Sequence, residues 1–524
     1  MKRKLPIGIQ DFTKIREDRF CYVDKTALIH QLVSGSGKTF FLSRPRRFGK
    51  SLLCSTLGAF FEGRRELFTG IVGQASLAVD SLDWDWKKHP VIRLDLNPGD
   101  YERGINELFA TINTTLDICA GKYGVTCEGE SLSARFTRLI NNLHEKTGER
   151  VAVIIDEYDK PLLGTIDNPE LHKETRSALK GFYGVLKSSD EHLAFVFLTG
   201  VTKFSQVSVF SELNNLIDLT LDPRYAALCG ITQDELEQNF EPEIAAIVKN
   251  REWERNVYLD RLRRFYNGYR FSRKPLTVYN PFGLLSHFDQ EGEFLPYWYE
   301  TGTPTFLIKL IEEQRIDILD LRKQIIHYGD FKKYDAENME AVPVLYQSGY
   351  LTITDYDDEL TEFTLGYPND EVRTSFASEL MEKYLRVPDR DLRAVVSALP
   401  RALLKGDVDA AMNALKLFFA SIPYDLVVKN ENYYQTVVHL VFTMLGMKCR
   451  SEVRIADGRI DTLVETNSFV YCFEFKLDGT AAQALKQIND KDYLLPWQGS
   501  GKKLFKVGVN FDHEKRNIGE WEKL

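Results

Sequence analysis

The stretch "SGSGKTFFLSRPRRFGKSLL", residues 34–53, contains two Gly-Lys-[Ser/Thr] triplets, at residues 37–39 and 49–51. Each triplet matches the end of a phosphate-binding loop, whose complete pattern is Gly-x-x-x-x-Gly-Lys-[Ser/Thr]. The first glycine of that pattern is replaced in both copies, by Leu32 and by Arg44. The letters therefore leave two candidates, and the surrounding secondary structure has to decide between them.

A phosphate-binding loop leaves a buried strand and opens directly into a helix, so that backbone N–H groups and the helix N-terminus face the phosphates. The second triplet meets this condition, because an apolar strand pattern at 39–42 precedes it and a helical pattern follows from Ser51 to Phe61. The first triplet follows a helical stretch and precedes that strand, which is typical of a helix end and turn. We therefore predict that Lys50 contacts the β- and γ-phosphates and that Ser51 binds Mg²⁺.

Four short apolar runs alternate with helical stretches from Thr39 to about Leu219. The runs are residues 39–42, 90–94, 151–155 and 194–198. Nearly continuous apolar runs of this length are typical of parallel strands buried on both faces, with the helical stretches as crossovers. The sequence therefore predicts an α/β domain of the P-loop NTPase kind.

Polar residues end the third and fourth of these runs. Asp156 and Glu157 follow the third run in the Walker B arrangement, in which the aspartate holds Mg²⁺ through water and the glutamate polarises the attacking water. Thr199 and Thr202 follow the fourth run and suit a sensor of the γ-phosphate. A solvated acidic loop would give the same letters as the Walker B pair. Three strand ends with compatible chemistry nevertheless favour a nucleotide site, which includes Asp156, Thr199 and Thr202.

The loop between strand and helix supplies the other predicted nucleotide contacts. They are Arg46, Arg47, Phe48, Gly49, Lys50, Ser51 and Leu52. Two roles stay open for Arg46 and Arg47, which either add charge against the triphosphate or pair with an acidic residue of a neighbouring element. Arg224, after the last predicted core strand, is a candidate sensor on the lid. Arg44 departs from the pattern, because a residue with a Cβ adopts positive φ less readily than glycine.

The composition limits the classes of function. A chain of 524 residues exceeds one ordinary core, so we expect about three domains. Its net charge of −9 argues against coating nucleic acid through bulk positive charge, although a local basic groove is compatible with it. The seven cysteines show no zinc spacing and are interpreted as reduced thiols. Neither a membrane-spanning run nor a secretory signal is found, so we expect a cytoplasmic protein with no membrane partner.

A different pattern follows the α/β region. Residues 222–288 are helical, with many charges and aromatic residues. Further on, a helix ends at Gly349 and two strands follow, at 350–353 and 363–365. A helix followed by a hairpin resembles a winged-helix module, and an ordinary helix-plus-hairpin explains the same letters, so both interpretations remain open.

The stretch "GRIDTLVETNSFVYCFEFKLDG", residues 458–479, carries a second constellation. One predicted strand carries Asp461, and the next ends in Glu474, Phe475 and Lys476. Alternation along a strand places Glu474 and Lys476 on one face, and a hairpin would bring Asp461 beside them. Two carboxylates form a Mg²⁺ site, and the lysine orients or deprotonates a water that attacks a phosphodiester. This is the layout of PD-(D/E)xK nucleases, although charges on an exposed hairpin would give the same letters.

The chain resembles, over nearly its whole length, an AAA-ATPase-like family of bacterial proteins with a C-terminal PD-(D/E)xK nuclease-type domain. The resemblance is carried by residues 5–33, 41–53, 153–162, 266–271, 278–281 and 345–351. In that family "RPRRFGK[ST]" is the usual P-loop, so Arg44 is expected at its position. The resemblance also implies that residues 22–26 lie near the adenine.

The same resemblance adds residues to the nuclease-like site. Glu431 starts a helix at the place where this fold usually carries an extra acid. A later helix, 480–489, carries Gln483 and Gln487 four residues apart, and Gln487 followed by Tyr493 is similar to the glutamine motif of RecB-like nucleases. A last strand, 505–510, completes the order of elements.

The predicted fold class is α/β, with three parts. Residues 1–221 form an AAA/STAND-like P-loop ATPase domain, residues 222–390 a helical lid and winged-helix-like region, and residues 391–524 a restriction-endonuclease-like α/β domain. The predicted function is an ATPase, with ATP and Mg²⁺, coupled to a Mg²⁺-dependent nuclease that acts on nucleic acid; family analogy favours DNA. The alternative is a regulatory ATPase switch whose nuclease-like domain is inactive and only binds nucleic acid or a protein partner. A homo-oligomer is open by analogy, although no arginine finger is evident.

Overall fold

The structure is a computed structural model in which the chain forms two compact units. It describes residues 3–70, 75–202, 213, 215–301, 307, 310–311, 314, 321, 324–332, 340–384, 389–422, 431–455 and 458–524. Unit 1 comprises Met1–Thr303 and Lys323–Asn369, and unit 2 comprises Pro304–Arg322 and Asp370–Leu524. The division into three parts with boundaries near 221 and 390 stays a prediction.

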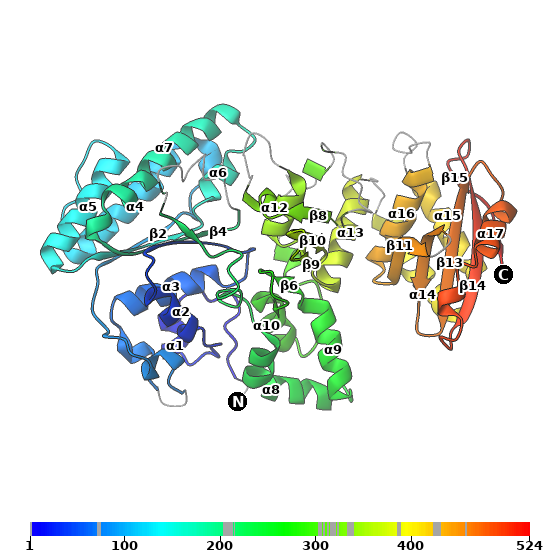
Figure 1. The fold of residues 1–524 in the computed structure, drawn as a ribbon, viewed down its shortest axis with the longest axis horizontal. Helices are drawn as coiled ribbons and strands as arrows, with labels where there is room; N and C mark the ends of the chain where they lie inside the picture. Colours follow the sequence, from blue (N-terminus) through cyan, green and yellow to red (C-terminus); the bar gives the residue numbers. More distant parts are fainter. Residues whose placement is uncertain are drawn as a thin grey trace. The chain divides into compact units, whose positions relative to one another are not determined.

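Unit 1 is built on a parallel sheet (Figure 1). Its strands are β1 (Thr39–Ser43), β2 (Val91–Asp95), β3 (Val151–Asp156), β4 (Leu193–Gly200) and β5 (Ile217–Asp218), in the order β2-β3-β4-β1-β5. All their pairings are parallel, and every residue of β1 and β3 is buried. This confirms the α/β prediction and brings the carboxyl ends of β1, β3 and β4 to one edge, where ligands bind in such sheets.

Helices cover both faces of this sheet. They are α1 (Phe12–Glu17), α2 (Thr26–Val33), α3 (Lys50–Phe61), α4 (Ile105–Tyr123), α5 (Leu132–Thr147), α6 (Lys160–Gly164) and α7 (Pro169–Ser188). Figure 1 shows α1–α3 on one side of the sheet and α4, α5 and α7 on the other. Within the described parts of the chain, no helix combines the length and apolarity needed to cross a membrane.

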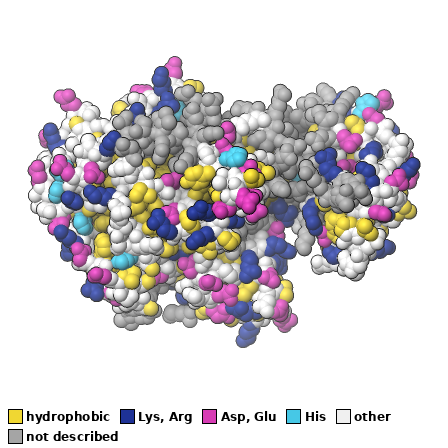
Figure 2. All heavy atoms as spheres, in the orientation of Figure 1, with side chains coloured by type: hydrophobic (Ala, Val, Ile, Leu, Met, Phe, Trp, Pro, Cys, Tyr) yellow, Lys and Arg dark blue, Asp and Glu magenta, His cyan; other side chains and the backbone are white. Residues whose placement is uncertain are grey.

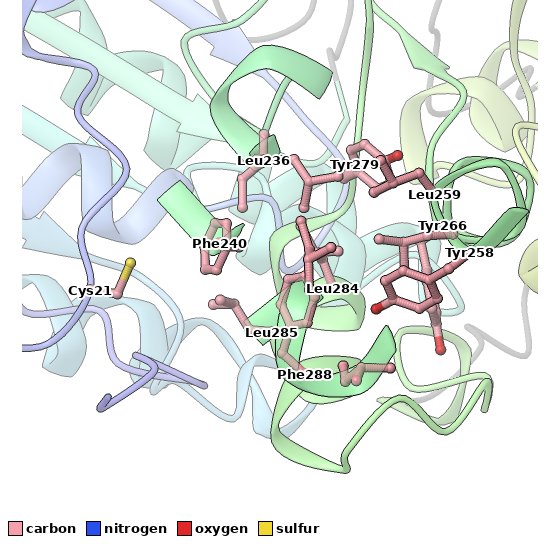
Figure 3. Packing of buried hydrophobic residues seen from close by; sticks show 14 residues of the cluster. Cys21, Leu236, Phe240, Tyr258, Leu259, Tyr266, Tyr279, Leu284, Leu285 and Phe288 are labelled. Carbon is pink, nitrogen blue, oxygen red and sulfur yellow. The ribbon is translucent and has the colours of Figure 1, made fainter. Parts of the chain in front are cut away.

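A helical subdomain follows in unit 1. It contains α8 (Gln233–Asn250), α9 (Arg255–Tyr266), α10 (Pro281–Asp289) and the short strands β6 (Tyr269–Arg270) and β7 (Thr277–Val278). Its buried cluster, drawn in Figure 3, centres on Phe240, Leu262, Leu284 and Phe288 and includes Cys21 from the N-terminal segment. The predicted helices of this region are therefore present, and the N-terminal segment packs with them, while their role as a lid stays a prediction.

The predicted helix and hairpin are α12 (Ala341–Ser348), β9 (Thr352–Asp357) and β10 (Glu362–Gly366). An unpredicted strand, β8 (Gln324–His327), pairs with β10 to complete a sheet of order β8-β10-β9. Gly349, with φ of 92°, ends the helix as expected. Seven of the eight residues of α12 are buried. A helix that reads DNA needs an exposed face, so this module is better suited to packing than to base recognition.

The buried imidazole of His287 on α10 predicts a pH dependence of stability. Its Nε2 lies 2.9 Å from the Tyr258 hydroxyl and its Nδ1 2.9 Å from the Glu293 carbonyl, and burial lowers the pKa of His287 to about 4. The unfolded chain has the ordinary histidine pKa of about 6.5, so between these values it binds more protons than the native state and stability falls as pH falls. We expect wild type to lose roughly 3 kcal/mol from pH 7 to pH 4 relative to His287→Gln, measured by urea denaturation. Parallel pH profiles would contradict it.

The described residues of unit 2 form helices before its sheet. They are α13 (Asp370–Tyr384), α14 (Asp389–Lys405), α15 (Val408–Ser421) and α16 (Glu431–Met444). The sheet has the order β11 (Lys448–Ile455), β12 (Gly458–Glu465), β13 (Phe469–Leu477), β14 (Lys503–Asp512) and β15 (Asn517–Lys523), and α17 (Ala481–Asp490) packs on β13 and β14 (Figure 1). A Cβ on Gly508 would strike the backbone of α17, so this glycine permits the close packing. The predicted order of helix, hairpin, helix and strand is confirmed, with β11 and β15 added at the edges.

Candidate functional site

The loop between β1 and α3 takes its special backbone conformation at two positions. Arg47 has φ of 63° and Gly49 has φ of 93°, and α3 begins at Lys50. Arg44, which stands where the pattern has its first glycine, is not among the positive-φ residues. A Cβ on Gly49 would meet no protein atom within 4 Å, so within the protein this glycine is needed for its left-handed backbone and not for close packing.

The side chain of Arg44 is buried away from this loop. Its Nη1 donates to the carbonyls of Ser43 and Thr220, at 2.8 and 2.9 Å, and its Nη2 to that of Tyr225 at 3.3 Å. The guanidinium lies 4.2 Å from the centre of the Phe271 ring. Arg44 therefore ties β1 to the segments that follow β5, which explains how an arginine fits here.

Lys50 is buried at the start of α3, with its side chain 3% exposed. Its Nζ lies 3.3 Å from the Pro45 carbonyl and 3.3 Å from Glu157 Oε1. Burial disfavours its charge, but the negative charges of Glu157, Asp156 and Asp159 outweigh burial and raise the pKa of Lys50. By contrast, Lys38, on the turn before β1, is 40% exposed and lies 3.5 Å from Asp190, an exposed residue just before β4.

Ser51 and Asp156 bring two oxygen ligands together. Asp156 ends β3 and is 2% exposed. Burial raises the pKa of its carboxyl group to about 6, and a hydrogen bond from Ser51 opposes the rise. Hydroxyl and carboxylate oxygens are ligands that Mg²⁺ accepts, and a cation would favour the ionised carboxylate. In the described residues no three His, Cys, Asp or Glu side chains form a metal cluster, so waters and phosphate would complete the shell.

The loops after β3 and β4 are joined by Asp159, which the sequence analysis did not single out. Its carboxylate is fully buried and accepts hydrogen bonds from Val201 N, Thr202 N and Thr202 Oγ1, at 3.1, 2.6 and 2.7 Å. Burial and the charge of Glu157 raise the pKa of Asp159 to about 6. A Cβ on Gly200 would collide with this carboxylate. The sequence hinted at Asp159 only through its place as the fourth letter of "DEYD", because its contact with Gly200 is visible only in the structure.

The two predicted sensor threonines lie at the correct edge of the sheet. Both hydroxyl groups are buried, and that of Thr199 donates to the Leu42 carbonyl at 2.7 Å, while that of Thr202 donates to Asp159. Their contact with a γ-phosphate therefore stays a prediction. Arg224 is paired with Asp222 at 2.6 Å and is 62% exposed, so its sensor role also stays a prediction.

The loop arginines stack on aromatic rings. Arg46 lies 5.4 Å from the ring centre of Trp298 and donates to the Thr301 carbonyl at 3.4 Å, and Arg47 lies 4.9 Å from that of Phe282. In the described part of the chain neither forms an ion pair with an acidic residue, so that alternative is not what the structure contains.

An apolar cavity of about 100 Å³ lies beside Gly49. Its walls come from the N-terminal segment around Tyr22 and Lys25, from Phe48 to Thr56, and from Leu228 to Ile231. Lys25 forms an ion pair with Glu235 of α8 at 2.6 Å. A largely apolar cavity next to the phosphate loop suits a nucleotide base, and the expected position of residues 22–26 near the adenine stays a prediction.

The residues of the second constellation meet in unit 2. Thr462 and Phe473 are the last pair in the antiparallel ladder of β12 and β13, and Asp461 and Glu474 are their direct neighbours along the two strands. Asp461 Oδ2 accepts from Phe475 N at 2.9 Å, and Lys476 Nζ lies 3.2 Å from Glu474 Oε1. The predicted shared face of Glu474 and Lys476 is thus present.

Helices supply the remaining predicted groups. Gln487 of α17 donates to Glu474 Oε1 and to the Tyr493 hydroxyl, the latter at 3.1 Å. Glu431 of α16 accepts from Leu477 N at 3.4 Å. Gln483, four residues before Gln487, instead accepts from Thr480 N and completes the helix cap of α17.

The two carboxyl groups of this site are buried without enough hydrogen bonds or positive charge to stabilise their ionised forms. Burial raises the pKa of Asp461 to about 6 and that of Glu474 to about 7, and the charge of Asp461 adds to the second rise. Glu474 is 1% exposed, and its Oε2 has no hydrogen-bond partner within the described structure. An unpaired buried carboxylate oxygen is costly, and a divalent cation between the two carboxylates would satisfy it. The residues present therefore fit Mg²⁺.

The surface shown in Figure 2 mixes basic and acidic side chains. The net charge of −9 is therefore not gathered into one acidic face on this side. Contacts with phosphates depend on local charge, so this surface is compatible with nucleic-acid binding.

Comparison with known proteins identifies a domain of known kind around each of the two candidate sites. A family model described as "Predicted AAA-ATPase" matches residues 6–210, and one described as "PD-(D/E)XK nuclease superfamily" matches residues 429–521. The "Uncharacterized protein in vnfD 5'region" of Azotobacter chroococcum mcd 1 is 39% identical over 528 residues, covering 99% of this chain and 98% of that protein. This chain therefore belongs to the bacterial family that joins a predicted AAA-ATPase to a domain of the PD-(D/E)XK nuclease superfamily.

Proposed function

We propose that unit 1 binds and hydrolyses ATP with Mg²⁺ and that unit 2 hydrolyses phosphodiester bonds of DNA with Mg²⁺. The observation that carries the proposal is convergence within each unit. Lys50, Ser51 and Asp156 meet at the end of the parallel sheet, and Asp461, Glu474 and Lys476 meet on the second sheet. Family membership supports hydrolase chemistry at both places.

In unit 1 the residues divide the work of phosphoryl transfer. Lys50 and the N-terminus of α3 neutralise phosphate charge, and Ser51 and Asp156 hold Mg²⁺, which offsets further charge on the phosphates when it is bound. Glu157 orients a water toward the γ-phosphate. Its contact with Lys50 at 3.3 Å has to open for this.

In unit 2 Asp461 and Glu474 hold the metal ion and Lys476 orients or deprotonates the attacking water. Gln487 keeps Glu474 in place through its hydrogen bond, and Glu431 adds a third carboxylate nearby. Hydrolysis adds water across the P–O bond, so ATP is not consumed in that step. ATP turnover would instead gate access to the nuclease site through a conformational switch.

The proposal also includes the cellular compartment and the binding partners of the protein. All seven cysteines are buried thiols, which fits a reducing compartment such as the cytoplasm. Nucleic acid is the proposed partner of unit 2, and self-association is proposed for the ATPase. The regulatory switch without nuclease activity is the outcome that would replace the leading proposal.

A Glu157→Gln variant separates ATP binding from turnover. We expect it to bind ATP as wild type does and to hydrolyse it about 10²-fold or more slowly, because the amide cannot polarise the attacking water. ATP binding and hydrolysis are measured for wild type and variant. A second measurement follows the degradation of linear and circular DNA by both proteins, with and without Mg²⁺ and ATP. If wild type shows ATP turnover but no Mg²⁺-dependent cleavage under any condition, the regulatory alternative holds.

A further inference from the structure

Three motifs of the chain have no role in the proposed chemistry, namely residues 266–271, 278–281 and 345–351. In the structure residues of these motifs, together with Phe282 and Trp298, lie against the phosphate loop, 44–48. We call the surrounding set the loop cradle, and its members are Tyr269, Phe271, Asn280, Phe282, Trp298 and Gly349.

The cradle contacts successive residues of the loop. A Cβ on Gly349 would lie 2.8 Å from Pro45, so this glycine allows the loop to approach. The Phe48 ring lies 4.7 Å from that of Tyr269 and 5.4 Å from that of Phe271, between centres. The loop backbone is therefore packed along the cradle on one side.

Two cradle side chains hold loop carbonyls. Trp298 is fully buried, and its Nε1 donates to the Arg46 carbonyl at 3.0 Å. Asn280 donates from Nδ2 to the Arg47 carbonyl at 3.5 Å, while its Oδ1 accepts from Gly283 N at 2.9 Å and caps α10. Both donors are thus fixed by their own surroundings.

These two bonds determine where the loop N–H groups point. In a planar trans peptide the C=O and the following N–H point in opposite directions. A carbonyl held toward the cradle therefore turns the N–H of Arg47, or of Phe48, away from it. Successive N–H groups turned to one side form an anion-binding nest.

We propose that Trp298 and Asn280 are positioning residues of the nucleotide site, which hold the carbonyls of Arg46 and Arg47 so that the next N–H groups face the phosphates. The inference rests on the proposed ATP site and adds a role for the downstream subdomain. It predicts that the two hydrogen bonds from Trp298 and Asn280 contribute to phosphate affinity and not to base affinity. The same two hydrogen bonds, from Trp298 and Asn280, also maintain the left-handed backbone conformation of Arg47, whose φ is 63°.

The test uses Trp298→Phe, which keeps an aromatic ring and removes the donor, and Asn280→Ser, which keeps a helix cap but does not reach the loop. We expect each to weaken ATP binding about five- to tenfold, the effect of one lost hydrogen bond, with adenosine binding unchanged. Binding is measured by titration with ATP and with adenosine. Trp253→Phe is the matched control, because Trp253 stacks on Tyr258 away from the loop.

The outcomes separate the inference from the proposed function. Absence of ATP binding by wild type would refute the proposed function itself. Wild-type ATP affinity in both variants, or equal losses for ATP and adenosine, would overturn the positioning role alone. A loss confined to ATP in either variant supports it.

Discussion

We expect Lys50→Ala to reduce ATP turnover by about 10²- to 10³-fold and to remove measurable ATP binding. Lys50 is the buried cation at the start of α3, and Glu157, Asp156 and Asp159 keep it charged. Removing one preorganised charge from a site that excludes water costs a hydrolase about that factor. The measurement is ATP binding by titration together with steady-state hydrolysis.

Lys38→Ala is the matched control for this prediction. Lys38 stands in the better textual match to a phosphate loop, yet its side chain is 40% exposed and its ammonium group pairs with the exposed Asp190. Surface ion pairs contribute about 0–1 kcal/mol, so its removal should leave binding and turnover unchanged. The reverse result, with Lys38→Ala inactive and Lys50→Ala active, would contradict the loop assignment.

The position of the phosphate loop could be predicted because it depends on local order. An apolar strand before residues 49–51 and a helical pattern after them are visible without tertiary structure, and the structure has both. The hairpin with Asp461, Glu474 and Lys476 could also be predicted from local sequence. Alternation along a strand determines which residues share a face.

The rest depended on contacts between distant segments. Arg44 bonds to carbonyls 176 and 181 residues away, so no local pattern explains why it replaces glycine. The stacking of Arg46 on Trp298 spans about half the chain and left the ion-pair interpretation equally open beforehand. In the sequence Asp159 is one acidic residue of an ordinary-looking acidic loop. Only the structure shows that its carboxylate fills the space that Gly200 leaves by lacking a side chain.

Glu474→Gln should abolish DNA cleavage and at the same time stabilise the metal-free protein. The pKa of Glu474 is raised to about 7, above the ordinary value near 4.5, so above pH 7 the charged side chain opposes folding. The neutral amide removes that cost, and we expect a gain of about 1–3 kcal/mol at pH 8, measured by urea denaturation without metal. The nuclease rate should fall by about 10²-fold or more, because a ligand of the metal that activates water is lost. Function and stability therefore move in opposite directions, as expected of an acid kept for chemistry.

Magnesium and a second glutamine variant make this prediction specific. Wild type should gain stability as Mg²⁺ is added, since an ion that binds only the native state stabilises it, whereas Glu474→Gln should gain much less. Glu465, on the same sheet, is the matched control, because its pairing with Arg450 and Lys502 lowers its pKa despite burial. Glu465→Gln should therefore lose stability at neutral pH and retain cleavage. If Glu474→Gln cleaved DNA like wild type, the buried carboxylate would serve folding alone, and its raised pKa would leave no physical reason for a glutamate at this position.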